Sequence, residues 1–458
     1  MLKLKTAVCT AAALAAACAA GSVATAPHAR AAGPIQHVVV LYLENHTFDN
    51  VLGFWCDVHP RRCTLANGAD GGMPSSVRLS NGATVTPTVD PDTVPSVLHS
   101  VAAQLKAIDG GKMDGWQKVG GCGAPSYICV SGYRPSQIPN ETALATKFAI
   151  SDETFSMQDS PSWGGHLYAV AATEDGFWGN NPVCPSGKTC SAGWGCHSGK
   201  VTQYGSAGTM EPSCIPDYSL GLANGGAFEP TPASYVPTIL DRLDGAGLPW
   251  RIYNSASHTG QALWAICPSY AECADTGQAK KWVPYSQFAT GAANGTLPAL
   301  SIITPGGTQG PDSQHNGNSM AAGDNWIGQV TSAVENSPEW SSTALFITYD
   351  DCGCFYDHVA PPLNSEGIRE GPRSPLVIVS PYAKPGYTDT TPATFAGILA
   401  YTEHTFGLPA LSSEDANAYD FSNAFNYSQV PLTPAKMVTR PLPASARHLS
   451  ASADNDGT

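Results

Sequence analysis

Residues 343–351 read Thr-Ala-Leu-Phe-Ile-Thr-Tyr-Asp-Asp, an apolar run that ends in two adjacent carboxylates. The run predicts a buried strand. Two like charges side by side repel each other, and a structural role rarely requires both. A divalent cation beside them removes the repulsion, because hard oxygen ligands suit such ions. The stretch therefore predicts a strand that delivers metal ligands at its carboxyl end.

A second strand-like run covers residues 35–43 and ends in the same way, since Glu44 and Asn45 follow it directly. The carboxyl ends of parallel strands meet at one edge of a sheet. We therefore expect this pair to join Asp350 and Asp351 in one metal site at that edge. Ligands that are all oxygen favour calcium, magnesium, manganese or iron over zinc.

Strand-like and helix-like segments alternate along most of the 458 residues. This alternation predicts an α/β fold with one central, mainly parallel sheet flanked by helices. The strands are far apart in sequence, so we expect large surface insertions, notably at residues 60–95 and 175–230, which are rich in small and polar residues. Further strands are expected at 250–254, 300–304 and 376–380, and helices at 97–108, 236–243, 326–335 and 395–406.

The N-terminal segment has the pattern of an export signal. Lys3 and Lys5 precede an apolar, alanine-rich stretch, and Ala-Arg-Ala at 29–31 offers a cleavage site. We expect a signal peptide at 1–31, a single α/β domain at 32–442 and a disordered tail at 443–458. No later apolar stretch is long enough to span a bilayer. The sequence therefore predicts a secreted protein.

The cysteines fit this compartment. Of the 14 in the chain, Cys9 and Cys18 fall in the expected signal, which leaves an even number in the mature protein. Short-loop disulfides are the natural interpretation in an exported chain, although spacing alone leaves the connectivity open. The local pairs are Cys56/Cys63, Cys122/Cys129, Cys184/Cys190, Cys196/Cys214, Cys267/Cys273 and Cys352/Cys354.

The formal net charge of −14 at pH 7 disfavours nucleic acid as a bound partner. It does not exclude phosphate esters as substrates, because a local metal ion overrides the field of the whole protein.

Ser162 is a candidate for chemistry because it follows a proline and precedes a helix-like segment. At a helix N-terminus, backbone N–H groups and the helix dipole favour negative charge on an attached group. That environment suits a serine that is transiently phosphorylated. A helix cap in a turn is the alternative interpretation.

Several blocks resemble a known family. Residues 43–53, Leu-Glu-Asn-His-Thr-Phe-Asp-Asn-Val-Leu-Gly, are similar to the Glu-Asn-Arg-Ser-Phe-Asp-His signature of the bacterial phosphoesterase family, which holds phospholipases C and secreted acid phosphatases. Residues 348–362 resemble its Tyr-Asp-Glu-x-Gly-Gly-x-Tyr-Asp-His-Val-x-Pro-Pro block. Further blocks follow the family order at 111–116, 243–253, 371–382 and 402–409.

The resemblance implies an alkaline-phosphatase-like fold, a metal at the C-terminal edge of the sheet and a Ser/Thr nucleophile. Carried over by position, it makes Ser162 the nucleophile and His315 and His358 candidate catalytic histidines. The implied metal ligands are Glu44, Asn45, Asp350 and Asp351.

The chain also departs from the family pattern. Gly164-Gly165-His166 replaces Pro-Asn-Arg after the nucleophile, His46 replaces an arginine, and Asp351 replaces a glutamate. The long C-terminal extension of the haemolytic phospholipases C does not follow the last block, which favours a general phosphoesterase.

The sequence therefore predicts a secreted, metal-dependent hydrolase of small-molecule or phospholipid phosphate esters, of the acid phosphatase or phospholipase C type. The alternative is a secreted, disulfide-stiffened binding protein with a structural ion. The position of Ser162 relative to the acidic strand ends separates the two. The oligomeric state stays open.

Overall fold

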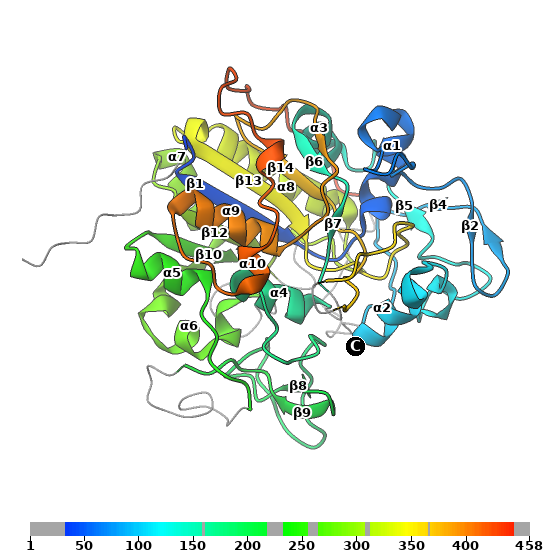
Figure 1. The fold of residues 1–458 in the computed structure, drawn as a ribbon, viewed down its shortest axis with the longest axis horizontal. Coiled ribbons are helices and arrows are strands. Elements are labelled where there is room, and N and C mark those ends of the chain that lie inside the picture. Colours follow the sequence, from blue (N-terminus) through cyan, green and yellow to red (C-terminus); the bar gives the residue numbers. More distant parts are fainter. Residues whose placement is uncertain are drawn as a thin grey trace, which may run out of the picture.

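The computed structural model describes residues 33–157, 161–217, 232–254, 264–306, 312–364 and 367–443. Its centre is an 8-stranded sheet with the order β11-β10-β12-β1-β13-β14-β6-β15 (Figure 1). The strands are β1 (His37–Leu43), β6 (Ala149–Ser151), β10 (Trp250–Asn254), β11 (Trp282–Pro284), β12 (Leu300–Thr304), β13 (Thr343–Tyr349), β14 (Leu376–Val379) and β15 (Thr388–Asp389).

The sheet is mainly parallel, as predicted. β1 runs parallel to β12 on one side and to β13 on the other, and β10 runs parallel to β11 and β12. Only β14 departs from this direction, since it is antiparallel to both β13 and β6. The expected strands are all present. The short strands β6, β11 and β15 were not predicted, because two or three residues are too few to show a periodicity.

The pairing of β1 with β13 sets the position of the acidic residues. Leu43 is in register with Tyr349, and the Asp350 N–H donates to the Leu43 carbonyl over 3.0 Å. Both strands therefore end at the same level. The residues that follow them leave the sheet side by side.

Both faces of the sheet are covered. Every residue of β13 is buried, which requires packing partners on both sides. Phe346 contacts Tyr401 of α9, which lies in front of the strands in Figure 1, while α8 packs with α3 and α7. The helices are α1 (Phe54–Val58), α2 (Val101–Ile108), α3 (Pro139–Lys147), α4 (Ser162–Ala171), α5 (Ile239–Gly245), α6 (Ala271–Asp275), α7 (Tyr285–Asn294), α8 (Met320–Glu335), α9 (Ala396–Phe406) and α10 (Ser413–Ala416).

Disulfides hold the insertions, as expected. Cys196–Cys214 brackets the hairpin of β8 (Val201–Tyr204) and β9 (Thr209–Pro212), which lies away from the sheet at the bottom of Figure 1. The other bonded pairs are Cys56–Cys63, Cys122–Cys129, Cys184–Cys190 and Cys267–Cys273.

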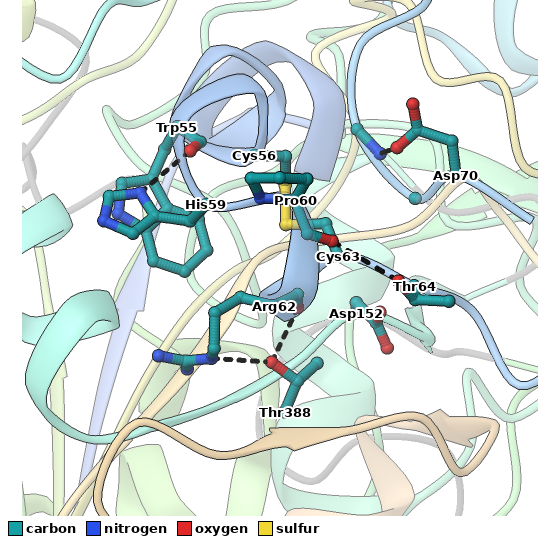
Figure 2. The surroundings of a disulfide bond; sticks show 12 residues. Trp55, Cys56, His59, Pro60, Arg62, Cys63, Thr64, Asp70, Asp152 and Thr388 are labelled. Atoms are coloured by element: carbon teal, nitrogen blue, oxygen red, sulfur yellow. Dashed lines mark hydrogen bonds between the residues drawn. A yellow bond between two sulfur atoms is a disulfide. The ribbon is translucent and has the colours of Figure 1, made fainter. Parts of the chain in front are cut away.

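Figure 2 shows how one of these bridges fixes the segment after α1. Cys56–Cys63 closes the turn, and the His59 ring stacks on Trp55 with 4.5 Å between ring centroids. From within this turn, the Arg62 Nε–H donates to the Thr388 hydroxyl of β15 over 3.0 Å. The short loop is thereby tied to the edge of the central sheet.

No helix among the described residues is long and apolar enough to cross a bilayer. The expected signal peptide, and the expected tail apart from its first residue, lie outside the described residues.

The sixth expected pair is not bonded. Cys352 and Cys354 are both free and buried, with their Sγ atoms 3.7 Å apart. The Cys354 N–H donates to Cys352 Sγ over 3.1 Å instead. A single intervening residue leaves a very short ring, which makes disulfide geometry hard to reach without moving the backbone.

We expect mass mapping of the purified protein to find the five cross-linked cysteine pairs and to find Cys352 and Cys354 as thiols. Because both are buried, an alkylating reagent should label them only after unfolding. Recovery of a peptide with a 352–354 bridge would contradict this prediction.

Candidate active site

The four acidic and amide side chains at the strand ends come together, and all four are fully buried: Glu44, Asn45, Asp350 and Asp351. They form two pairs, each of which contacts a different side chain. Glu44 and Asp350 face one partner, His166, whereas Asn45 and Asp351 face another, Ser162.

Ser162 is the first residue of α4 and has no exposed surface. Its hydroxyl donates to Asp351 Oδ2 over 3.2 Å. The Asn45 side-chain amide donates to Ser162 Oγ over 3.0 Å and to Asp351 Oδ2 over 2.8 Å. The three side chains form a closed hydrogen-bonded triangle. Ser162 therefore is not a helix cap, since its hydroxyl contacts the strand ends and not its own helix.

One expectation about the helix N-terminus is wrong. The N–H groups of Trp163 and Gly164 are not available to a ligand, because they donate to Asn181 Oδ1 over 2.8 Å and to the Gly179 carbonyl over 3.1 Å. What α4 contributes at Ser162 is the direction of its dipole, which still favours negative charge at this end.

A glycine lets α4 come this close to the sheet. A Cβ atom on Gly165 would lie 2.9 Å from the Asp350 carbonyl oxygen and 3.2 Å from the Tyr42 hydroxyl. The Tyr42 hydroxyl in turn donates to the Gly165 carbonyl over 2.9 Å. The helix is therefore held directly against the ends of β1 and β13.

His166 lies one helical turn after Ser162 and points to the same side. Its Nδ1 is 2.8 Å from the Trp264 carbonyl oxygen. Its Nε2 is 3.0 Å from Glu44 Oε1 and 3.6 Å from Asp350 Oδ2. The ligand atoms of these three side chains all lie within 4.8 Å of one another, so they can hold a single metal ion.

His166 was not predicted as a site residue from the sequence, where it stands out only because it replaces the arginine of the family pattern. The available signal was its spacing of four residues from Ser162, which on a helix places both side chains on one face.

The site carries a concentration of negative charge. Burial, and then the charge of Asp350, raises the pKa of Asp351 well above its ordinary value. Asp350 Oδ2 is buried and has no hydrogen-bond partner among the described residues. His46, which stands where the family has an arginine, does not neutralise this charge, because burial lowers its pKa to about 4. A divalent cation fits the cluster of Glu44, His166 and Asp350.

His315 lies beside this cluster without joining it. Its ring centroid is 5.3 Å from that of Trp264, whose carbonyl accepts the His166 hydrogen bond. It also lies 5.5 Å from the ring of His99. Trp264 therefore contacts both His315 and His166.

His358 lies in a different group. Its Nδ1 is 2.7 Å from Asp49 Oδ2, and its Nε2 is 2.9 Å from the Asp70 carbonyl oxygen. The fully buried Arg373 side chain bridges Asp49 and Asp357, with 2.9 Å on each side. Since the guanidinium and the His358 ring together pair with these two carboxylates, this group needs no metal ion. The structure does not bring His358 to Ser162.

The charge state of His358 follows from this setting. Burial alone would lower its pKa, but the Asp49 carboxylate outweighs that effect by charge and hydrogen bonding and raises the pKa to about 9. His358 is therefore an imidazolium at neutral pH and stabilises the loop that follows β13.

We expect His358→Gln to lower the melting temperature in a pH-dependent way. A folded-state pKa of about 9, above the ordinary 6.5, gives stability that is fully present below pH 6.5 and is lost as the pH rises through 9. The difference in melting temperature between wild type and variant should be largest at pH 6 and should shrink towards pH 10. An unchanged difference across this range would contradict the ion pair.

Comparison with solved structures gives distant similarities. A protein of the alkaline phosphatase superfamily from Vibrio parahaemolyticus aligns with a TM-score of 0.36 and 11% identity, over 77% of this chain and 71% of the other. An inactive murine ectonucleotide pyrophosphatase/phosphodiesterase 5 in complex with AMP aligns with a TM-score of 0.37 and 8% identity, over 63% and 94%. The α/β class rests on the sheet described above.

Several relatives by sequence are named as phospholipases C. A non-specific phospholipase C6 of Arabidopsis thaliana is 25% identical over 88% of this chain and 74% of its own length. A non-hemolytic phospholipase C of Pseudomonas aeruginosa is 24% identical over 86% of this chain but only 57% of its own length. Phospholipase C A of Mycobacterium tuberculosis is 23% identical over 89% and 80%.

The family comparison covers most of the chain, because the model of the Phosphoesterase family matches residues 35–409. The matched region includes both strand ends, α4 and the loops after β13. This chain belongs to the Phosphoesterase family and is a hydrolase of phosphoric esters.

Proposed function

We propose that this protein is a secreted, metal-dependent phosphodiesterase of the phospholipase C type with Ser162 as its nucleophile. The observation that carries the proposal is the position of Ser162 Oγ, which is buried and hydrogen-bonded to Asn45 and Asp351 beside the Glu44, His166 and Asp350 cluster. A binding protein with a structural ion has no reason to hold a hydroxyl group there.

Glu44, His166 and Asp350 would hold the ion. A divalent metal in this place would polarise a phosphoryl oxygen and stabilise the serine alkoxide. The proton transfers and the nucleophilic attack of the proposed reaction are carried out by side chains of this protein.

Asp351 is the group placed to take the Ser162 proton, since its Oδ2 already accepts that hydrogen bond. The Asn45 side-chain amide donates to Ser162 Oγ and to Asp351 Oδ2, and it thereby holds the hydroxyl beside the carboxylate. Serine and base are therefore already aligned before substrate binds.

The reaction then follows in two displacements. Ser162 Oγ forms a bond to phosphorus, the bond between phosphorus and the ester oxygen breaks, and the leaving alkoxide takes a proton from His315. A water molecule next attacks the phosphoserine and gives its proton to His315, the bond between phosphorus and Oγ breaks, and the released Oγ regains a proton from Asp351.

A phospholipid or a related phosphodiester is the proposed substrate class, because the relatives described above are named as phospholipases C. A panel of phosphatidylcholine, sphingomyelin, p-nitrophenyl phosphate and a phosphodiester analogue, each with and without chelator, tests this assignment. Turnover of the monoester alone would identify a phosphatase instead.

Export is supported by the disulfides. The bonded cysteine pairs require an oxidising compartment to form. The signal-like segment at 1–31 would direct the chain there. N-terminal sequencing of protein from the culture medium tests this part of the proposal, and a mature protein that begins at Met1 would contradict it.

We expect Ser162→Ala to abolish turnover while the protein stays folded, because only a small buried hydroxyl is removed. The control is Ser380→Ala, which removes a buried hydroxyl bonded to the Thr343 carbonyl at the opposite end of β13. Activity and melting curves should be measured for both. Ser162→Ala activity within about tenfold of wild type, a barrier change of only ~1.4 kcal/mol, would rule out the assignment.

We expect His315→Gln to slow esters with poor leaving groups by about 10²- to 10⁴-fold, the usual contribution of a general acid. A p-nitrophenyl ester should be affected much less, because its leaving group needs no proton. The matched control is His358→Gln, which should leave the ratio of the two rates unchanged at neutral pH. Equal losses on both substrates would show that His315 does not protonate the leaving group.

A further inference from the structure

His166 presents its Nε2 to the acidic cluster, and the contact of its other ring nitrogen determines which nitrogen carries the proton. A carbonyl oxygen cannot donate, so the 2.8 Å contact with Trp264 requires the proton to be on Nδ1. In a neutral ring the Nε2 lone pair then points at Glu44 Oε1 and Asp350 Oδ2, at 3.0 and 3.6 Å. Three sets of lone pairs cannot face one another without a positive charge between them.

The surroundings match those of a metal-bound histidine. Such a histidine usually donates its second ring N–H to a backbone carbonyl or a carboxylate, which fixes the tautomer and the ring orientation. His166 does so at Trp264, and it is only 3% exposed. The buried Asp350 Oδ2, with no hydrogen-bond partner in the described part of the chain, is a further atom of the cluster that a cation would satisfy.

The kind of ligand determines the kind of metal. Calcium and magnesium take oxygen ligands, whereas imidazole suits zinc and other late transition ions. A set of one histidine and two carboxylates also leaves coordination positions open for substrate, as in catalytic zinc sites. Asn45 and Asp351, two of the four oxygen ligands expected from the sequence, contact Ser162 instead.

We propose that His166 is a metal ligand and that its nitrogen makes this site select a late first-row transition ion, zinc above all, over magnesium and calcium. The proposal rests on the proposed function, because it names the ion that the phosphoesterase would use. It also replaces the expectation of an all-oxygen site.

The first experiment measures the ion directly. Wild-type protein is stripped with a chelator, loaded with Zn²⁺ and dialysed against an excess of Mg²⁺ and Ca²⁺. Elemental analysis should find Zn²⁺ retained, and melting curves should show that it raises the melting temperature more than either competitor does. Displacement of Zn²⁺ by Mg²⁺ or Ca²⁺ would overturn the proposal.

The second experiment removes the nitrogen. His166→Gln should weaken Zn²⁺ binding by more than the ~10- to 100-fold that the loss of an outer partner of a ligand costs. His166→Asp, which restores an oxygen ligand, should shift the preference towards Mg²⁺ and Mn²⁺. The control is His404→Gln, since His404 is 62% exposed and pairs with Asp420 away from the site. Wild-type Zn²⁺ affinity in His166→Gln would overturn the proposal.

A measurement on the wild type keeps the test valid if the variants do not fold. Cu²⁺-loaded protein examined by pulsed electron paramagnetic resonance should show coupling to the remote nitrogen of one bound imidazole. Its absence would exclude His166 as a ligand.

The outcomes separate this inference from the proposed function. A protein that prefers Mg²⁺ or Ca²⁺, and that still loses all turnover in Ser162→Ala, would overturn the role of His166 and leave the serine mechanism intact. A protein that binds no divalent ion and is insensitive to chelator would overturn both.

Discussion

The in-register parallel pairing of β1 and β13 is the constraint on which the site depends. It brings Glu44 level with Asp350 and Asn45 level with Asp351, at a buried edge where water cannot screen their charges. Such an arrangement is unfavourable unless positive charge and hydrogen-bond donors are supplied. The chain meets this requirement with α4, which places a histidine against one pair and a serine against the other.

One face of α4 meets both pairs of side chains. Ser162 and His166 are one turn apart on this helix, so the serine contacts one pair and the histidine the other. The close approach depends on Gly165, whose missing side chain leaves room for the Asp350 carbonyl. A glycine in the first turn, which would weaken an isolated helix, is here the condition for contact between α4 and the acidic residues at the strand ends.

A second network supports the first. The loops that follow β1 and β13 are joined by Arg373, which pairs with Asp49 on one and Asp357 on the other. The Thr47 hydroxyl donates to the Tyr356 carbonyl across the same two loops over 2.8 Å. The Phe-Asp and Tyr-Asp-His parts of the family signatures therefore hold the site loops in place, and His358 belongs to this scaffold.

The strands, their parallel arrangement and the grouping of four polar side chains at one edge were predictable from sequence, because each depends on a local pattern and on the shared direction of parallel strands. Ser162 was predictable from its turn and its place in a family block.

Which of the four polar side chains contact Ser162, and which contact His166, was not predictable. Whether Asp351 faces a metal or a serine depends on how α4 packs against the strand ends, and no local pattern records that. In the sequence, His166 stood out only because it replaces the arginine of the family pattern. The Trp264 carbonyl that sets its tautomer lies far away in the chain, so no local pattern indicated its role. Spacing likewise paired Cys352 with Cys354, but the backbone of the site loop decides whether two sulfur atoms can bond. The sequence by itself determined which chemical groups the chain carries to the sheet edge, and tertiary packing decided which of them face one another.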